Sequence, residues 1–438
     1  MGFEEATAYL DALGVDAMKS LTPSLHRIEA ICAVLDHPEM SVPAIHITGT
    51  NGKTSTARIA TSLLGAAGLN AATYTSPHLQ TIRERLTRSG EAISADDFGD
   101  LFDHILPYVE MVEKQLDDRL SYFEVLTAMF FLWAAEAPVD VMVVEVGLGG
   151  RWDATNVVMA PVAVITNVGL DHTGLLGMDR SVIAREKAGI IKPSATVVTS
   201  ELHAEILSVI TEEAALLEAN VKALERDFRV EDNRTAFGGR YLSVRTSTRD
   251  YEDIFLPLHG SHQGVNAAAA LEAVADFLPA GSLEADVVAE GMSAADVPGR
   301  LESLRPEDGE GTAIILDVAH NPDGMSALIG SLLEAFAFDR IVFVLGILGD
   351  KDYRGMLTEL TRVPCDVIAT QAKSVRSVPL QELVSAAEEL GLPCTTIEDV
   401  GDAVKAALAT ARRTDLVCIT GSHYVVGEAR TLLVGAPE

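Results

Sequence analysis

The sequence predicts an α/β fold whose first part is organised around a phosphate-binding loop. Short, almost wholly apolar runs alternate with helix-compatible stretches along the whole chain, which is typical of parallel sheets covered by helices. A chain of 438 residues is longer than one hydrophobic core usually supports, so we expect two or three domains. One apolar run, Val42–Ile47, leads into a glycine-containing turn and then into a helix-compatible stretch that starts at Lys53.

The turn carries Gly-Thr-Asn-Gly-Lys-Thr-Ser, a short form of the nucleotide-binding loop in which Ile47 stands where the first glycine of the longer form would be. Glycines let the backbone approach phosphates, and the N–H groups at the helix start point at them. Lys53 adds positive charge, and the hydroxyl of Thr54 or Ser55 can contact Mg²⁺ or phosphate. A plain helix-capping turn is the alternative, but it does not explain a lysine followed by two hydroxyl residues. The predicted nucleotide contacts of the loop are Gly49, Thr50, Asn51, Gly52, Lys53, Thr54 and Ser55.

Composition argues against two classes of partner. The net charge of −31 disfavours binding to nucleic acid or to anionic membranes, because both recruit Lys and Arg. No apolar run approaches the roughly 18 residues of a membrane span, and the acidic N-terminus lacks a signal-peptide pattern, so we expect a cytoplasmic protein. The cysteines show no metal-binding or redox spacing, and we expect buried thiols at Cys32, Cys365, Cys394 and Cys418.

A second apolar run, Val139–Glu145, ends on a carboxylate. A buried acid is costly unless it is paired or bound to a cation. In open α/β sheets, ligands bind at the carboxyl ends of the strands, and Mg²⁺ prefers oxygen ligands. Glu145 is therefore the strongest acidic candidate for a Mg²⁺ site.

Several specific motifs follow one another along the chain. They are Thr75–Leu79 (T-S-P-H-L), Gly147–Asn156 (G-L-G-G-R-W-D-A-T-N), Asn167–His172 (N-x-x-x-D-H), Arg185–Ile190, Gly260–Ala267, Pro298–Arg300 (P-G-R) and Asp317–Pro322 (D-x-A-H-N-P). In this order they resemble the folylpolyglutamate synthase and dihydrofolate synthase family of the Mur ligase superfamily. The resemblance covers nearly the whole chain, and Gly147–Asn156 is its most specific part.

The resemblance implies two domains. Residues 1–298 would form a P-loop-type Mur ligase central domain with a parallel sheet, and residues 299–438 a smaller, Rossmann-like α/β domain that takes part in glutamate ligation. The boundary falls at a stretch similar to the family's W-P-G-R hinge, where Val297 replaces the usual Trp. A monomer is implied as well.

The resemblance also implies a metal site and a modified lysine. Ser76, Glu145 and His172 would be Mg²⁺ ligands. Lys187 matches a lysine that is carbamylated in many relatives, which would give it a negative charge near the metal. Because only a neutral amine reacts with CO₂, we expect burial or nearby positive charge to lower its pKa. A plain surface lysine is the alternative.

The remaining implied contacts belong to three substrates: ATP, L-glutamate and a pterin or folate acceptor. Two of them have structural alternatives, because Phe123 could be a core residue at a helix start and Ser422 a helix N-cap. The implied ATP contacts beyond the loop are Gln263, Asn266, Arg300 and Asp317. The implied acceptor and glutamate contacts are Arg85, Phe123, Asp153, Ala154 and Ser422.

These residues fit an ATP-dependent ligation of L-glutamate to dihydropteroate, to a (tetrahydro)folate (poly)glutamate, or to both, through an acyl phosphate. Lys53, His172, Lys187 and His320 would be the catalytic residues. One alternative is a Mur-type ligase acting on a UDP-sugar acceptor, which Thr54 favours because the folate family has glycine there. The other alternative is a non-catalytic nucleotide-binding switch.

Overall fold

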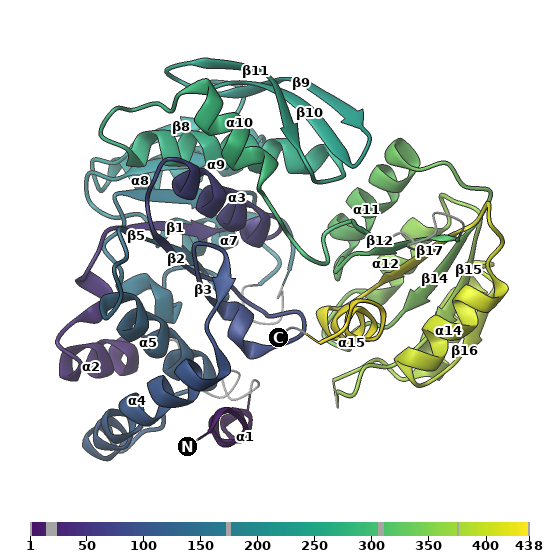
Figure 1. Cartoon of the computed structure of the whole chain (residues 1–438), viewed down its shortest axis with the longest axis horizontal. Coiled ribbons are helices and arrows are strands. Elements are labelled where there is room, and N and C mark those ends of the chain that lie inside the picture. The colour runs from purple at the N-terminus through teal and green to yellow at the C-terminus, as the bar shows by residue number, and fades with distance from the viewer. Residues whose placement is uncertain (1, 15–23, 172–176, 305–310, 375, 437–438) are drawn as a thin grey trace.

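The computed structural model describes residues 2–14, 24–171, 177–304, 311–374 and 376–436. Figure 1 shows two bodies side by side, which we name the N-terminal lobe (through α10, Ala285–Ser293) and the C-terminal lobe (from β12, Glu302–Leu304). Each lobe has its own sheet with helices on both faces. The predicted α/β fold class is confirmed, and the domain boundary at 298/299 stays a prediction.

The large sheet of the N-terminal lobe has the strand order β4-β3-β2-β5-β1-β6-β7-β8. Its six parallel strands are β1 (Ala44–Thr48), β2 (Ala71–Tyr74), β5 (Val141–Glu145), β6 (Val162–Ile165), β7 (Thr196–Thr199) and β8 (Asn220–Ala223). The antiparallel edge consists of β3 (Leu86–Arg88) and β4 (Glu91–Ala92). In the centre, Ile47 pairs with Glu145 and Thr48 with Ile165, so the carboxyl ends of three strands meet.

Helices cover both faces of this sheet because successive strand residues alternate between two apolar cores. Ile45 and Ile47 pack in one core with α3 (Lys53–Ala66), α9 (Ser261–Phe277) and α10. The core on the other face contains α1 (Phe3–Leu13), α2 (His26–Val34), α4 (Ala95–Leu116) and α5 (Tyr122–Ala135). A smaller core joins α7 (Arg180–Ala188) and α8 (Ala204–Ala215) to β6 and β7. Short 3₁₀ helices are η2 (Pro38–Met40), η3 (Ile82–Arg85) and η4 (Ala154–Val157).

Residues 195–256 contain both strands and a helix. A three-stranded antiparallel sheet forms from β9 (Arg229–Ala236), β10 (Gly239–Arg245) and β11 (Asp250–Leu256). The region also contains the helix α8, because its buried Ile206, Val209 and Ile210 recur at helical spacing.

The C-terminal lobe is built on a second sheet with the order β12-β13-β17-β14-β15-β16, in which only β12 is antiparallel to its neighbour. Its other strands are β13 (Ala313–Leu316), β14 (Ile341–Leu345), β15 (Cys365–Ala369), β16 (Cys394–Thr396) and β17 (Leu416–Thr420). One face packs on α11 (Pro322–Ala335), α12 (Tyr353–Leu360) and α13 (Leu380–Glu389). The other face packs on α14 (Val400–Thr410) and α15 (His423–Val434).

Two expectations from composition can be compared with the fold. Cys32, Cys365 and Cys418 are buried as expected, but Cys394 is only partly buried because β16 is an edge strand. Across the described ranges, no helix has both the length and the apolar character needed to cross a membrane.

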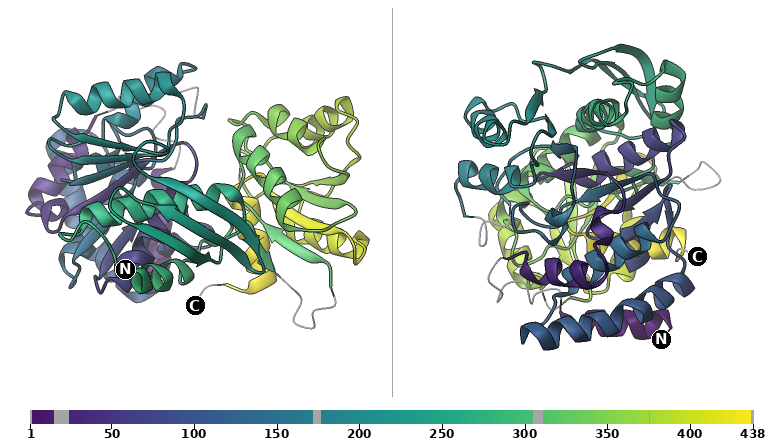
Figure 2. Two further views of the ribbon diagram at one scale, coloured as in Figure 1. Left: turned by 90° about the horizontal axis from the view of Figure 1, so that it is seen from above. Right: turned by 90° about the vertical axis from the view of Figure 1, so that its left-hand side faces the viewer.

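The two lobes lie against each other (Figures 1 and 2), and polar side chains connect them. The fully buried Arg240 of β10 pairs with Glu334 of α11 at 2.9 Å. Gln80 donates to Thr431 at 3.0 Å on the opposite side of the interface. These contacts close the lobes around the carboxyl ends of both sheets.

Candidate active site

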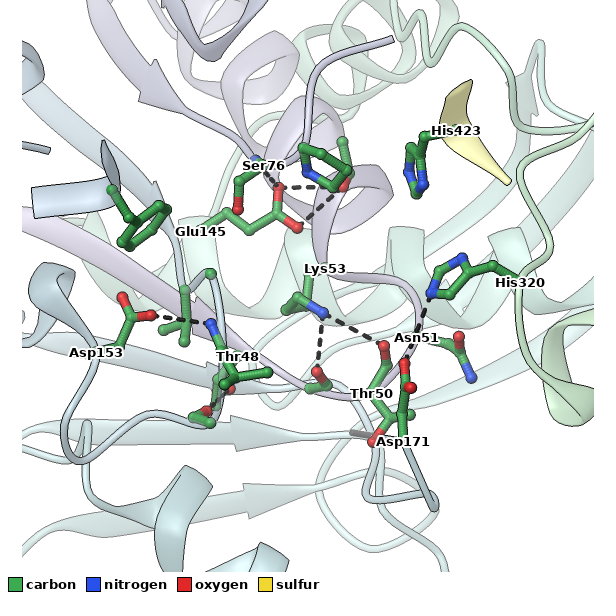
Figure 3. Close-up of a pocket in the computed structure, with 18 of the residues that line it drawn as sticks. Thr48, Thr50, Asn51, Lys53, Ser76, Glu145, Asp153, Asp171, His320 and His423 are labelled. Carbon is green, nitrogen blue, oxygen red and sulfur yellow. Dashed lines mark hydrogen bonds and ion pairs between the residues drawn. The ribbon is translucent and has the colours of Figure 1, made fainter. Parts of the chain in front are cut away.

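A cavity of about 300 Å³ lies between the lobes, over the carboxyl ends of β1 and β5 (Figure 3). It is lined from one side by the phosphate loop, Glu145, Asp153 and Lys187, and from the other by His320. The structure therefore brings together residues that the sequence assigned to nucleotide, metal and acceptor.

The phosphate loop has the backbone that the motif predicts. Gly52 has φ +85° at the start of α3, and a Cβ there would lie 2.4 Å from Oδ1 of Asn266. Oδ1 of Asn167 accepts hydrogen bonds from the backbone N–H groups of Thr50 and Asn51, at 3.2 and 2.9 Å. The ammonium of Lys53 donates to the loop carbonyls of Gly49 and Thr50, at 3.0 and 3.3 Å, and burial lowers its pKa. The ammonium group of Lys53 is therefore held inside the phosphate loop.

Glu145 lies beside this lysine, at the end of β5, with only 1% of its surface exposed. The hydroxyl of Thr54 is 3.0 Å from both of its carboxylate oxygens, and the backbone N–H of Ser76 donates to Oε2 at 3.2 Å. Burial raises the pKa of Glu145, and the charge of Lys53 opposes that rise.

The donor set around Glu145 fits Mg²⁺, since carboxylate and hydroxyl oxygens are the ligands this ion prefers. Ser76 and Thr54 supply the hydroxyls, and both line the cavity with Glu145. The third predicted ligand, His172, lies outside the described residues. Within the described ranges there is no group of three or more His, Cys, Asp or Glu placed to hold a metal.

Lys187 is a buried lysine of α7, with 4% of its surface exposed, so the surface alternative is wrong. Burial, followed by the charge of Lys53, lowers the pKa of Lys187 to about 7. Helix α7 packs closely against the Gly147–Asn156 loop. A Cβ atom on Gly150 would lie only 2.8 Å from the carbonyl oxygen of Glu186, so a residue larger than glycine would not fit there. A neutral amine at this position is what carbamylation requires.

The Gly147–Asn156 loop holds Asp153 with 2% of its surface exposed. Its carboxylate accepts hydrogen bonds from the N–H of Leu148 at 2.9 Å and from the N–H and hydroxyl of Thr155 at 3.0 and 2.5 Å. Burial raises the pKa of Asp153, and these hydrogen bonds oppose the rise. The neighbouring Ala154 is buried in η4 and is not among the residues lining this cavity.

Phe123 and Arg85 also line this cavity. Phe123 packs in the core against Tyr74, with ring centroids 5.8 Å apart, and also lines the cavity, so its contact with the acceptor stays a prediction. Nε of Arg85 donates to Nδ1 of His78 at 2.9 Å, and its guanidinium lies over the ring of Tyr122. Burial lowers the pKa of His78 to about 3, which keeps it a neutral acceptor. The sequence assigned no role to His78, although the T-S-P-H-L motif contains it.

A second cavity, of about 360 Å³, adjoins the other side of the phosphate loop and contains Ser55, Arg300 and the Gln263–Asn266 pair, whose side chains are 3.0 Å apart. Asp317 also lines it, and its carboxylate accepts the N–H groups of Leu301 and Ala319, at 2.9 and 2.8 Å. This cavity therefore collects the predicted ATP contacts that lie outside the loop.

The C-terminal lobe contributes Lys351, which was not predicted from the sequence, together with the predicted His320. Nζ of Lys351 lies 2.6 Å from Oδ1 of Asp171, in the opposite lobe, and Nε2 of His320 lies 3.6 Å from Oδ2 of the same carboxylate. Asn321 donates to the side chain of Asn51 at 3.1 Å. Ser422 lines the first cavity and also caps α15, through a 3.3 Å hydrogen bond from the N–H of Val425. The sequence Asp350-Lys351-Asp352, which follows the buried strand β14, was the available signal for Lys351.

Two protein-family models match most of this chain. Residues 47–274 match the Mur ligase middle domain, and residues 299–423 match the Mur ligase glutamate ligase domain. The chain therefore belongs to the Mur ligase family.

Similar proteins and solved structures identify the family within the Mur ligases. The dihydrofolate synthase/folylpolyglutamate synthase of Mycobacterium tuberculosis is 40% identical, over 95% of this chain and 91% of the relative. The structure of Mycobacterium tuberculosis folylpolyglutamate synthase complexed with ADP has a TM-score of 0.93 at 39% identity, covering 100% of this chain and 99% of that one. Escherichia coli FolC in complex with DHPP and ADP has a TM-score of 0.87 at 30% identity, covering 99% and 98%.

The chain belongs to the folylpolyglutamate synthase and dihydrofolate synthase family, as the sequence predicted. It is an ATP-dependent ligase that adds glutamate in folate metabolism.

Proposed function

We propose that this enzyme joins the α-amine of L-glutamate to the carboxylate of dihydropteroate and of (tetrahydro)folate (poly)glutamates. The observation that carries the proposal is the shared cavity, into which both the phosphate loop and the Asp153 loop open. An acceptor whose ring lies at Asp153 can present its distant carboxylate toward the γ-phosphate near Lys53.

The reaction takes two steps. An oxygen of the acceptor carboxylate attacks the γ-phosphorus, and ADP leaves, which gives an acyl phosphate. The glutamate nitrogen then attacks the acyl carbon, an amide bond forms, and inorganic phosphate departs while the amine loses a proton. Lys53 and Arg300 stabilise the charge on the transferred phosphoryl group. His320 acts at the amino-acid or phosphate end of the site, and His172 acts as a ligand of Mg²⁺.

Ser76, Glu145 and His172 would hold Mg²⁺, which supplies charge neutralisation for phosphoryl transfer when bound. A carbamate on Lys187 would add an anion next to this site. Support for that modification comes from the burial of Lys187 and its lowered pKa.

Acceptor recognition is assigned to Asp153, Ala154, Phe123 and Arg85. A carboxylate can accept hydrogen bonds from a ring N–H and an exocyclic amine together, and an aromatic ring suits a flat heterocycle. Arg85 suits the acceptor's carboxylates. Ser422 is assigned to glutamate. We further propose a cytoplasmic monomer with its domain boundary at 298/299.

The test is Mg²⁺-dependent ADP release from ATP and L-glutamate, with dihydropteroate and tetrahydrofolate supplied separately. Release with both acceptors supports the bifunctional proposal, and release with one assigns the acceptor. If ATP binds but neither acceptor triggers release, the proposal fails, and UDP-sugar acceptors or a switch role become the readings to test.

A further inference from the structure

A fully buried histidine, His46, lies in the central strand of the large sheet and lines neither of the two cavities described above. His46 of β1 is 0% exposed and sits between Val144 of β5 and Ala163 of β6. Burial, with a smaller effect from the charge of Lys192, lowers the pKa of His46 to about 3. The ring is therefore neutral and carries one N–H group.

The hydrogen bonds around this ring determine where that proton lies. Nε2 of His46 is 2.9 Å from Oγ1 of Thr155, and the same Oγ1 is 2.5 Å from Oδ1 of Asp153. The carboxylate of Asp153 accepts from the N–H groups of Leu148 and Thr155, which favours its ionised form. An ionised carboxylate only accepts, so the single hydroxyl proton of Thr155 points to Asp153. Nε2 of His46 must then donate to the hydroxyl oxygen. Nδ1 of His46 is then the unprotonated ring nitrogen, and within the described residues it has no hydrogen-bond partner.

We propose that His46 is a positioning residue for the acceptor, because it fixes the Thr155 hydroxyl that holds the carboxylate of Asp153 toward the cavity. The inference rests on the proposed role of Asp153. It gives β1 two functions, since the strand also delivers the phosphate loop three residues later, at Gly49.

A purely structural histidine makes a different prediction. Loss of a packing residue from β1 would disturb the phosphate loop and change the KM for ATP. Loss of a positioning residue changes the KM for the acceptor and leaves that for ATP alone. The carboxylate of Asp153 keeps the N–H groups of Leu148 and Thr155 in either case, so the expected effect is partial.

The experiment compares steady-state kinetics of the full chain with four single variants. Thr155→Val removes the hydroxyl at nearly constant volume, and Thr155→Ser keeps it. His46→Gln keeps an N–H donor near the Nε2 position, whereas His46→Leu removes it. We expect Thr155→Val and His46→Leu to raise the acceptor KM about 5- to 10-fold, the range for one lost hydrogen bond. The KM for ATP should stay unchanged, and His46→Gln and Thr155→Ser should restore the acceptor KM.

The double variant His46→Leu/Thr155→Val adds a second readout. If His46 acts through Thr155, the double variant is no worse than Thr155→Val alone. Additive losses, an unchanged acceptor KM in Thr155→Val, or an equal rise in the ATP KM would overturn the inference. Thr155→Val carries the test if His46→Leu does not fold.

Asp153→Ala separates this inference from the proposed function. If Asp153→Ala raises the acceptor KM and the Thr155 and His46 variants do not, only the positioning inference fails. If Asp153→Ala leaves the acceptor KM unchanged, the assigned role of Asp153 fails first.

Discussion

Each lobe has a buried strand that runs into a carboxylate, and the two carboxylates are used differently. Glu145 ends β5 and Asp317 directly follows β13, with 1% and 7% of their surfaces exposed. Burial raises the pKa of both. Glu145 faces a hydroxyl and one backbone N–H, beside Lys53. Asp317 accepts two backbone N–H groups from its own lobe.

Because both carboxylates are buried, their different hydrogen-bond donors determine what each of them can bind. A hydroxyl can rotate and leave carboxylate lone pairs free for a cation, whereas backbone N–H groups are fixed. Asp317 therefore shapes the turn at Leu301, next to Arg300, whose guanidinium is influenced by both Asp317 and Glu145. Its contact with ATP stays a prediction.

The largest expected effect is that of Glu145→Gln. Loss of the buried charge next to the phosphoryl group should lower kcat on the order of 100- to 1,000-fold, the range for removing one preorganised electrostatic group. Steady-state ADP release measures it. Glu272→Gln is a matched control, because Glu272 is 0% exposed and pairs with Lys222. Equal losses in both variants would contradict a specific role of Glu145.

Lys187 is expected to give a pH dependence in the same cavity. With its pKa at about 7, the neutral amine increases as pH rises, so carbamylation should increase too. Between about pH 6 and about pH 8 the neutral fraction of the amine rises roughly tenfold. A carbamate signal in ¹³C NMR with labelled bicarbonate measures this, with Lys187→Arg as the control. A pH-independent signal, or one that survives in Lys187→Arg, would contradict it.

Thr54→Val tests the hydroxyl side of the comparison. Without the hydrogen bond to Glu145, kcat should fall about fivefold, which corresponds to about 1 kcal/mol. Thr54→Ser keeps the hydroxyl and should retain most of the activity. If Val and Ser behave alike, the hydroxyl does not hold Glu145 in place.

Asp317→Asn should have the smallest effect on kcat and a clear effect on stability. An amide can face only one of the two N–H donors with its oxygen, so the free energy of unfolding should fall by about 1–3 kcal/mol. The KM for ATP should rise while kcat changes little. Urea unfolding and steady-state kinetics measure the two effects, and a collapse of kcat as large as that of Glu145→Gln would remove the distinction between the carboxylates.

The buried strands of the parallel sheets, the phosphate loop and the acids at both strand ends could be predicted from the sequence, because short-range patterns encode them. It could not show which donors each acid faces. Thr54 and Glu145 are 91 positions apart, and Lys351 and Asp171 are 180 apart, so these pairs exist only once the chain has folded. The same holds for the contact between His46 and Thr155, 109 positions apart.

The most direct test of this account is the binding of Mn²⁺, as a substitute for Mg²⁺, in the presence of ADP. Electron paramagnetic resonance of the free ion would be recorded with the unmodified chain, with Glu145→Gln and with Asp317→Asn. We expect Glu145→Gln to lose the bound ion and Asp317→Asn to retain it. Retention in Glu145→Gln, or equal loss in both variants, would contradict the different roles of the two carboxylates.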